Sequence, residues 1–596
     1  MGGEFGTSLA DYSGTIPRLL DRAAERDPGG TWLRTDDLRL TFEQAAGRVG
    51  GVAAELADAG IGHGDLVMLT ARTTPEYLFA WLALAALGAV SVPVNPASAA
   101  AELAGLIGQV RPVAVLTDPG LYPVLGQAGR VGGAGVVGGA GGDGGAGGDG
   151  IASGAGGDGI AGGAGGDGGH AGQGLAPVLD QAARRDGPVR AVIDVNRLGA
   201  GRTAGHALAD LPHAPVRPGD LAVLIPTSGT TGRSKLVMQT HRAYALAGEG
   251  FPFWMELGAS DRLMTSLPLF HINAPIYSVL GSLVCGAGLV LVPRFSASGF
   301  LDTARRHGAT EFNAIGAMLE ILMRQPERPD DADTPLRLCY AGPAPERERH
   351  EQIERRFGLR IVVGYAMSES PYGLVWPRGQ RPYGTLGAVR QHPYLGTINE
   401  AKVVTPDDGG DGAGAEGASG APLGPGETGE ILLRNPVITP GYWGMPEETA
   451  AVLVKGDGEE GGGWLHTGDL VTVNSDGTYT FVGRRKEVLR RRGENLSPLE
   501  VEEVLDSHPA VLESAVVGVA SELTEEEIKA FVVAAPGADI DLAGLRDYAA
   551  ERLSAFKVPR FWQIIEELPR TPTARIAKHR LPPGRQPADY DGAGSP

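Results

Sequence analysis

Alternation between two kinds of apolar pattern constrains the fold of this chain more than any other feature. The run from Thr41 to Gly60 has apolar residues at spacings of three and four, which predicts an amphipathic helix. The strand-like run LVMLTA follows at 66–71. The alternation extends from about Leu19 to Leu116, resumes at Ala191 and continues to about Phe481. Alternating helices and strands predict layered sheets, so the expected fold class is α/β.

Two glycine-rich stretches interrupt this pattern. Residues 129–173 consist mainly of Gly, Ala and Asp repeats, and residues 407–422 read DDGGDGAGAEGASGAP. Glycine loses the most conformational entropy on ordering, and these stretches have almost nothing apolar to bury. We therefore expect a disordered surface insertion at 129–173 and a flexible loop at 407–422. A regulatory or partner-binding role for the insertion is the alternative.

The chain is too long for one hydrophobic core at 596 residues, so at least two domains are expected. Residues 1–482 are predicted to form a large N-terminal domain. A helix-like run at 497–508, strand-like runs at 514–520 and 529–535, and a helix near 542–553 predict a small α+β unit. We expect a separate C-terminal domain at 488–596, with a disordered tail, behind a hinge at 483–487.

The net charge, the cysteines and the apolar stretches of the chain indicate which partners and which cellular compartment to expect. The formal charge is −19 with a pI near 5.2, which argues against nucleic acid as the main partner. The two cysteines, Cys285 and Cys339, lack CxxC spacing, so ordinary buried thiols are expected. The N-terminal residues lack a signal-peptide pattern, and no apolar stretch reaches the length of a membrane span. A cytoplasmic protein without membrane insertion is expected.

The strongest functional motif is LIPTSGTTGRSKLVMQTH at 224–241. An apolar strand, 221–225, runs into a loop of hydroxyl residues and glycines that ends in Lys235. Glycines let the backbone approach a phosphate, hydroxyls and amides donate hydrogen bonds to it, and lysine neutralises its charge. The order of residues differs from the GxxxxGK[ST] pattern. The alternative, a flexible hydroxyl-rich turn, explains the ordered run less well.

This motif resembles the phosphate loop of the adenylate-forming superfamily, which includes acyl-CoA synthetases, and further motifs follow in that family's order. They are GYAMSES (364–370), GEILLRNPVITPGYWGMPEET (429–449), WLHTGDL (464–470), TFVGRRKEVLRRRGENLSPLEVEEVL (480–505) and FKVPRFWQIIEELPRTPTARIAKHRL (556–581). The likeness covers nearly the whole chain outside the glycine-rich stretches. LPLFHINAP (267–275) is most similar to ligases that activate carnitine or crotonobetaine.

The resemblance implies roles for residues of the first motifs. Residues of the loop would surround the pyrophosphate of ATP: Thr227, Ser228, Gly229, Thr230, Thr231, Gly232 and Lys235. Glu369, together with Thr227, would hold Mg²⁺, and Ser368 precedes it in the nucleotide-binding segment. Tyr365 would stack on adenine, and His271 would line the acid pocket. The alternatives are a solvated surface charge for Glu369 and core packing for Tyr365 and His271.

The later motifs carry the remaining implied roles. Asp469 would accept hydrogen bonds from both ribose hydroxyls, and Arg484 would also contact the ribose. The resemblance implies a mobile C-terminal lid domain, 488–596, for which Lys486 would be the pivot of rotation. Gly493 would face the tunnel for the pantetheine arm of coenzyme A. The cluster Arg490–Arg492 either holds an anionic acceptor or forms a solvated face. A turn is the alternative reading of the Gly468–Asp469 pair.

The C-terminal motif departs from the family. Relatives carry roughly PRTPTGK, whose lysine bonds the acid and the α-phosphate, whereas this chain reads PRTPTARIAKHRL. Arg575 stands in the place of the lysine, and Lys578 follows three residues later. Three alternatives are open. Arg575 takes the role of the lysine, Lys578 takes it instead, or the adenylation step itself is altered. Ser234, Leu236 and Ala366 also differ from the common pattern and suggest a specialised branch, such as secondary metabolism.

The function expected from the resemblance is ATP-dependent activation of an acid as its adenylate, with release of pyrophosphate. An acid–CoA ligase using Mg²⁺ and coenzyme A is the first expectation. The alternative is an adenylating enzyme with another acceptor or acid: a carrier protein, an amine, or nitrite for diazotisation. The expected partners are therefore small molecules, a homodimer remains open, and a nucleotide-binding pseudoenzyme is the non-enzymatic alternative.

Overall fold

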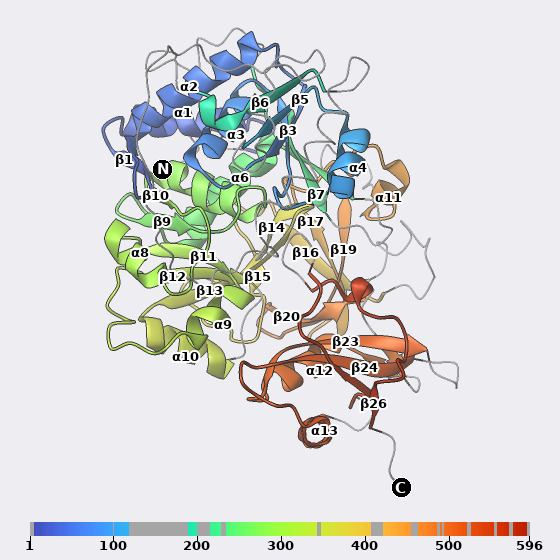
Figure 1. Cartoon of the computed structure of the whole chain (residues 1–596). Helices are drawn as coiled ribbons and strands as arrows, with labels where there is room; N and C mark the ends of the chain where they lie inside the picture. The colour runs from blue at the N-terminus through green and yellow to red at the C-terminus, as the bar shows by residue number, and fades with distance from the viewer. Residues whose placement is uncertain are drawn as a thin grey trace. The chain divides into compact units, whose positions relative to one another are not determined.

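A computed structural model of the chain describes residues 5–6, 8–98, 100–118, 189–199, 215–227, 234–342, 347–406, 421–454, 463–485, 489–491, 494–520, 526–553, 557–570 and 576–592. The predicted insertion at 129–173, nearly all of the predicted loop at 407–422 and the last residues of the tail lie outside these ranges. The described chain packs into two compact units (Figure 1). Unit 1 comprises Met1–Glu400 and Leu433–Trp464, and unit 2 comprises Ala401–Leu432 and Leu465–Pro596. The domain boundary expected at 482–488 stays a prediction.

Unit 1 contains two sheets. The six-stranded sheet has the order β6-β5-β3-β4-β7-β8, with β3 (Leu66–Thr70), β4 (Val90–Pro93), β5 (Ala114–Thr117), β6 (Ala191–Asp194), β7 (Leu221–Thr227) and β8 (Lys235–Thr240). The nine-stranded sheet has the order β15-β14-β13-β12-β11-β9-β10-β1-β2. Its strands are β1 (Thr31–Arg34), β2 (Arg39–Thr41), β9 (Arg262–Thr265), β10 (Gly288–Leu291), β11 (Glu311–Ile315), β12 (Leu338–Gly342), β13 (Arg360–Met367), β14 (Ser370–Val375) and β15 (Ala388–Val389).

Helices form a layer that touches both sheets. The layer contains α1 (Ile16–Arg26), α2 (Phe42–Asp58), α3 (Pro75–Ala86), α6 (His241–Met255), the π-helix η4 (Ala274–Leu280) and α7 (Gly281–Cys285). Helix α6 contacts β8 of one sheet and β14 of the other. Every residue of α3 from Tyr77 to Ala86 is buried, as expected for a helix that is apolar on all sides. The predicted helix at 41–60 is confirmed, with Thr41 as its N-cap in a capping box with Gln44.

Strand β3 shows that both faces of the six-stranded sheet are covered. Val67 and Leu69 belong to the core around the central helices, whereas Met68 packs in a second core with α4 (Ala100–Val110). Because successive side chains of a strand point to opposite faces, α4 must cover the other face of the six-stranded sheet. The predicted α/β fold class is therefore confirmed. Cys285 and Cys339 are free and buried, as expected, and burial raises the pKa of Cys285 to about 11.

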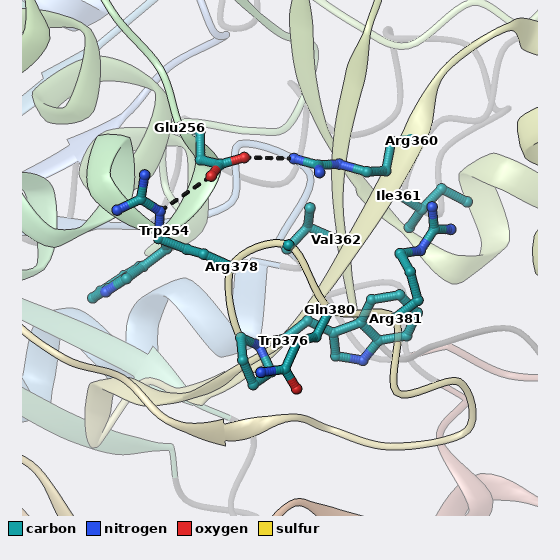
Figure 2. Close-up of a pocket in the computed structure, with 11 residues that line it drawn as sticks. Trp254, Glu256, Arg360, Ile361, Val362, Trp376, Arg378, Gln380 and Arg381 are labelled. Atoms are coloured by element: carbon teal, nitrogen blue, oxygen red, sulfur yellow. Dashed lines mark hydrogen bonds and ion pairs between the residues drawn. The ribbon is translucent and has the colours of Figure 1, made fainter.

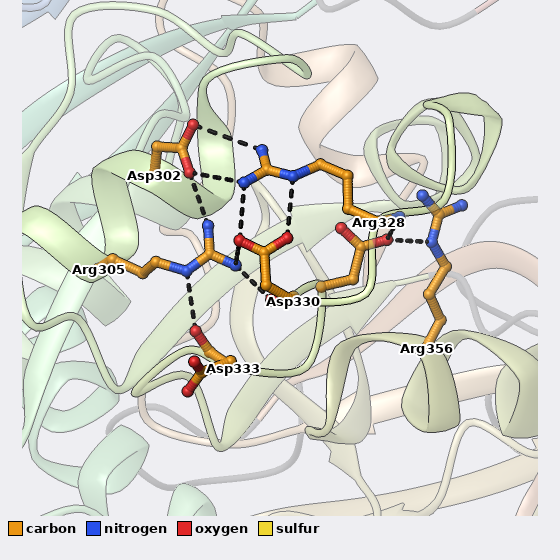
Figure 3. A network of polar contacts seen from close by, with 7 residues as sticks. Asp302, Arg305, Arg328, Asp330, Asp333 and Arg356 are labelled. Atoms are coloured by element: carbon orange, nitrogen blue, oxygen red, sulfur yellow. Dashed lines mark hydrogen bonds and ion pairs between the residues drawn. The ribbon is translucent and has the colours of Figure 1, made fainter.

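Shorter elements complete unit 1. They are η2 (Val195–Arg197), α8 (Phe300–His307), α9 (Gly316–Arg324), α10 (Arg347–Phe357), α11 (Pro446–Ala450) and β18 (Leu453–Val454). A polar network ties the segment before β12 to its neighbours (Figure 3). Arg328 contacts Asp302 of α8 and Asp330, and Arg305 of α8 donates to the carbonyl of Asp333 at 2.8 Å. Exposed pairs of this kind contribute little individually, so the network acts mainly by restricting the segment.

Unit 2 is built on a second pair of sheets. One contains β16 (Glu400–Val404), β17 (Thr428–Arg434), β19 (Trp464–Val473) and β20 (Tyr479–Arg484). The other has the order β23-β24-β25-β26, with β23 (Val511–Ala520), β24 (Glu526–Ala534), β25 (Phe561–Ile564) and β26 (Tyr590–Asp591). The hairpin β21 (Leu489–Arg491) and β22 (Glu494–Leu496), the helices α12 (Pro498–Asp506) and α13 (Leu542–Ala550), and the 3-10 turn η7 (Lys578–Arg580) complete it. The small α+β unit expected from the sequence is present.

A buried ion pair fastens the end of the described chain to unit 2. Lys529 of β24 and Asp589 lie 2.8 Å apart, and neither side chain is exposed to solvent. Lys529 also donates to the carbonyl of Gly584 at 3.3 Å, and Asp589 accepts from the amide of Gln586 at 2.7 Å. Removing one member of a buried pair leaves a desolvated charge without compensation.

We predict that Lys529→Met lowers the free energy of unfolding of the full chain by about 3–5 kcal/mol, measured by urea denaturation. The matched control is Lys557→Met, because the Lys557–Glu500 pair is considerably more exposed and should cost under about 1 kcal/mol. The double variant Lys529→Met/Asp589→Leu should recover part of the loss. Equal effects of Lys529→Met and Lys557→Met would contradict the prediction.

Candidate functional site

The strand before the predicted phosphate loop pairs with the strand that follows it. β7 and β8 are antiparallel, and the last residue of β7, Thr227, is the register partner of the first residue of β8, Lys235. The Thr227 hydroxyl donates to the carbonyl of Lys235 at 3.4 Å, and both residues are half-buried. The predicted residues Ser228, Gly229, Thr230, Thr231 and Gly232 lie outside the described residues. The two ends of the loop are therefore held together by sheet pairing.

Ser368 and Glu369 form the two-residue turn of the hairpin between β13 and β14, in which Met367 pairs with Ser370. The Ser368 carbonyl accepts a hydrogen bond from the side chain of Gln239 at 2.7 Å. Because Gln239 belongs to β8, the strand that begins with Lys235 is tied directly to the turn that carries Glu369. The structure therefore brings together Thr227, Lys235, Ser368 and Glu369 from motifs more than a hundred residues apart.

Tyr442 is a residue of this cluster that was not among the predicted site residues. Its hydroxyl donates to Oε1 of Glu369 at 3.0 Å, and Nζ of Lys235 lies 4.5 Å from the centroid of its ring. Burial, the charge of Glu369 and the hydrogen bond to that carboxylate raise the pKa of Tyr442. Its place in the GYW string of the 429–449 motif was the available signal, but no spacing rule predicts that this ring meets Glu369.

Tyr365 and His271 lie in unit 1 on separate segments. Tyr365 is a half-buried residue of β13 opposite Leu374, and a Cβ at Gly373 would approach the Tyr365 carbonyl to 2.4 Å. His271 follows a turn in which its amide donates to Pro268, and its ring is 4.5 Å from that of Phe270. Stacking of Tyr365 on adenine and a role of His271 in the acid pocket stay predictions.

In unit 2 the two predicted ribose-binding residues form a cross-strand pair. Asp469 of β19 is the register partner of Arg484 of β20, and Nε of Arg484 lies 3.1 Å from Oδ1 of Asp469. The Asp469 side chain is 2% exposed, whereas that of Arg484 is 44% exposed. The arginine therefore neutralises a carboxylate that is otherwise largely desolvated.

The turn before Asp469 is shaped by a second buried carboxylate. Gly468 has φ +72°, a conformation that favours glycine, and its amide donates to Glu430 at 3.0 Å. Burial raises the pKa of Glu430, but the hydrogen bond and charge of His466, the Gly468 amide and the charge of Arg485 outweigh burial and leave the pKa lowered. Glu430 was missed by the sequence analysis, although it follows the glycine that opens the 429–449 motif.

The predicted residues of the C-terminal motifs are only partly described. Lys486, Gly493 and Arg575 lie outside the described residues. Lys578 is described: its Nζ lies 2.8 Å from Oε1 of Glu502 on α12. In the basic cluster, Arg491 is 6% exposed and forms an ion pair with Glu527 at 2.6 Å, so it is not a solvated charge.

Among the described residues, no three His, Cys, Asp or Glu side chains gather as a preformed metal site. Mg²⁺ in proteins is commonly bound by one or two carboxylates together with the phosphates of the substrate. A single carboxylate, Glu369, near the end of a phosphate loop is consistent with this coordination preference. Within the same described ranges, the helices are too short or too polar to cross a bilayer.

A surface pocket of about 250 Å³ lies at the beginning of β13 (Figure 2). Glu256 forms ion pairs with Arg360 at 3.1 Å and with Arg378 at 3.2 Å. Arg381, also in the lining, pairs with Glu354. Arg360 and Arg378 share one carboxylate, so the three arginines of the lining are matched by only two carboxylates, those of Glu256 and Glu354. None of the predicted site residues lines it.

Comparison with known proteins identifies the family. Residues 20–443 match the model of the AMP-binding enzyme family, and residues 500–575 match the AMP-binding enzyme C-terminal domain. The chain belongs to the AMP-binding enzyme family and is therefore an adenylate-forming enzyme.

Similar curated proteins are CoA ligases. The sulfoacetate–CoA ligase of Cupriavidus necator is 34% identical over 392 residues, which cover 65% of this chain and 71% of the relative. The crotonobetaine/carnitine–CoA ligase of Salmonella heidelberg is 30% identical over 530 residues, which cover 88% and 89% of the two chains.

Solved structures share the fold. MatB from Rhodopseudomonas palustris, solved with ATP bound, has a TM-score of 0.73 at 24% identity and covers 95% of this chain and 98% of its own. The O-succinylbenzoate CoA synthetase of Bacillus subtilis, solved with AMP, has a TM-score of 0.73 at 22% identity and covers 96% and 99%. At these identities the likeness shows the fold alone.

The helix that follows β8 begins with a neutral histidine. His241 is 0% exposed, and neither ring nitrogen has a hydrogen-bond partner among the described residues. Burial lowers its pKa to about 4 against the opposing charge of Asp220. The unfolded chain, with a pKa near 6.5, binds this proton more readily, so stability falls as the pH drops through this window.

We predict that wild-type protein loses about 2 kcal/mol more stability than His241→Phe when the pH falls from about 7 to about 5. For each protein, the free energy of unfolding at one pH is subtracted from that at the other. Any cost of packing the phenyl ring is the same at both pH values and therefore cancels. Urea denaturation at the two pH values is the measurement. Equal pH dependence in both proteins would show that His241 is protonated in the folded state.

Proposed function

We propose that this adenylate-forming enzyme is an acid–CoA ligase. A carboxylate oxygen attacks the α-phosphorus of ATP, the bond to the β-phosphate oxygen breaks, and pyrophosphate leaves. The thiolate of coenzyme A then attacks the acyl carbon of the mixed anhydride and AMP departs. The observation that carries this proposal is the match over 88% of the chain, at 30% identity, to a crotonobetaine/carnitine–CoA ligase.

The charge arrangement in unit 1 supports the first step. Lys235 places a cation at one end of the loop, against the ring of Tyr442, with Thr227 at the other end. A cation at this place stabilises an oxygen that becomes more negative as a phosphoryl bond breaks. The Glu369 carboxylate, which accepts from the Tyr442 hydroxyl, would contribute only through a bound metal ion. We propose Glu369 and Thr227 as the protein ligands of a Mg²⁺ ion, which would supply further charge neutralisation on the phosphates.

The remaining sites follow the same proposal. Tyr365 would bind adenine and Asp469 with Arg484 would bind ribose. His271 would line the acid pocket, Lys486 would be the pivot, and Gly493 would border the tunnel for coenzyme A. A cytoplasmic location, a role in secondary metabolism and assembly as a homodimer belong to the proposal as well.

Arg575 is our choice for the role of the family's C-terminal lysine. Its rival, Lys578, is engaged by Glu502, whose Oε1 also accepts the amide of Val516 at 2.6 Å. Releasing Lys578 would break an ion pair whose two side chains are 19% and 11% exposed, which costs free energy. A guanidinium is permanently charged and can bridge phosphate and carboxylate oxygens.

The function is tested by measuring pyrophosphate release from ATP and Mg²⁺ with a panel of small acids. We expect release that requires an acid and an acyl thioester product that appears only with coenzyme A. Pyrophosphate release without thioester would indicate another acceptor, and release with nitrite plus an aryl amine would indicate diazotisation. No ATP-dependent release with any acid would overturn the proposal.

We predict that Arg575→Ala slows adenylate formation about 100-fold or more, because it removes a charge that contacts the reacting groups. Lys578→Ala should lower thermal stability while the adenylation rate stays within about threefold of wild type, as for loss of a structural ion pair. Single-turnover pyrophosphate release measures the rate. A larger rate loss in Lys578→Ala would reverse the assignment.

A further inference from the structure

Tyr442 lies between the two opposite charges of the unit 1 site. Its ring face meets the ammonium of Lys235 at 4.5 Å, and its hydroxyl donates to Oε1 of Glu369 at 3.0 Å. We propose that Tyr442 is a positioning residue that fixes the metal-binding carboxylate and the phosphate-loop lysine in one geometry. The inference rests on the proposed function, because it assigns Tyr442 a task in binding Mg²⁺ and ATP.

The backbone around Tyr442 is held by both elements that carry the charges. The amide of Met238 on β8 donates to Gly441 at 3.0 Å, and the amide of Trp443 donates to Leu236 at 2.8 Å. The amide of Thr439 donates to the carbonyl of Glu369 at 2.7 Å. Segment 439–443 thus runs along β8 and closes over the hairpin turn.

The amide of Tyr442 itself is fixed by Thr449, whose hydroxyl oxygen accepts it at 2.9 Å. Thr449 lies on α11, so the ring is oriented from a second element as well. With the backbone restrained on both sides, the ring has little freedom to move away from Glu369. A side chain locked in this way can hold a neighbouring group without further ordering when a ligand binds.

The hydroxyl of Tyr442 acts as a donor, because a phenol is protonated near neutral pH and a carboxylate is an acceptor only. One carboxylate oxygen is thereby engaged, while no donor among the described residues reaches Oε2 of Glu369. A carboxylate with one oxygen held by hydrogen bonding presents the other to a cation in a defined direction.

The ring face has a separate effect on Lys235. A lysine side chain has many rotamers, and attraction between its ammonium and an aromatic face favours those that keep the cation near the ring. The hydroxyl and the ring therefore make distinguishable contributions: the hydroxyl acts on Glu369, and the ring acts on Lys235. Phenylalanine at 442 would keep the effect of the ring on Lys235 and lose the effect of the hydroxyl on Glu369.

The experiment measures ATP binding by calorimetry, once with Mg²⁺ and once with EDTA, in the full-length protein. In Tyr442→Phe we expect the Mg²⁺-dependent gain in ATP affinity to fall about tenfold, which is the usual effect of removing a partner of a metal ligand. Metal-free affinity should stay within about twofold of wild type, because the ring remains over Lys235. Tyr442→Leu should lower the metal-free affinity as well, by about threefold.

Tyr12→Phe is the matched control. The Tyr12 hydroxyl donates to the carboxylate of Glu249 at 2.9 Å and is also buried, so the same chemical change is made away from Lys235 and Glu369. Both ATP affinities should equal those of wild type, whatever the loss in thermal stability. The double variant Tyr442→Phe/Glu369→Gln should show the same Mg²⁺-dependent gain as Glu369→Gln alone, because the hydroxyl acts through that carboxylate.

A wild-type Mg²⁺-dependent gain in Tyr442→Phe would overturn the inference while leaving the proposed function intact. Absence of ATP binding by the wild-type protein would instead overturn the proposed function. If Tyr442→Phe does not fold, Thr449→Val provides the test. It leaves the Tyr442 side chain in place and removes the acceptor of the Tyr442 amide, together with the hydrogen bond from the Thr449 hydroxyl to the Met445 carbonyl. We then expect a smaller loss of the Mg²⁺-dependent gain, about threefold, and an unchanged gain would overturn the inference.

Discussion

Antiparallel pairing of β7 with β8 is the constraint on which the unit 1 site depends. It sets Thr227 opposite Lys235 and so fixes both ends of the phosphate-loop motif. From β8 the restraint passes outward, since Gln239 bonds the Ser368 turn and the backbone of β8 bonds segment 439–443. Three motifs that are far apart in the sequence are therefore assembled on one strand. Main-chain hydrogen bonds make the strand pairing and the contact with segment 439–443, whereas the link to the Ser368 turn needs the side chain of Gln239.

The fold could be predicted from the sequence where periodicity was regular. The helix at 41–60, the strand before the phosphate loop and the elements of the small C-terminal unit all follow from local patterns. The pairing partners could not be derived in this way, because a strand's pattern indicates which faces are buried but not which strand lies beside it. The order of the nine-stranded sheet, with β10 between β9 and β1, is an example.

In the candidate site, too, some features could be predicted from the sequence and others could not. Motif resemblance named Asp469 and Arg484, and the structure places them opposite each other on β19 and β20. It did not name Tyr442 or Glu430, because their importance comes from contacts with residues 73 and 38 positions away, Glu369 and Gly468. A motif resemblance identifies residues that contact the substrates in relatives. Residues that hold other side chains in place are identified only from the distances in a structure. The roles of Lys486, Gly493 and Arg575 remain predictions.

The buried pair of Lys529 and Asp589 has a consequence for the design of shortened proteins. The cation sits on β24, between β23 and β25, whereas its carboxylate partner, Asp589, is supplied from near the C-terminus. A truncation before residue 589 would remove the counter-charge and strand an ammonium in an apolar interior. The C-terminal segment is thus an electrostatic component of the domain, and a shortened protein should retain Asp589.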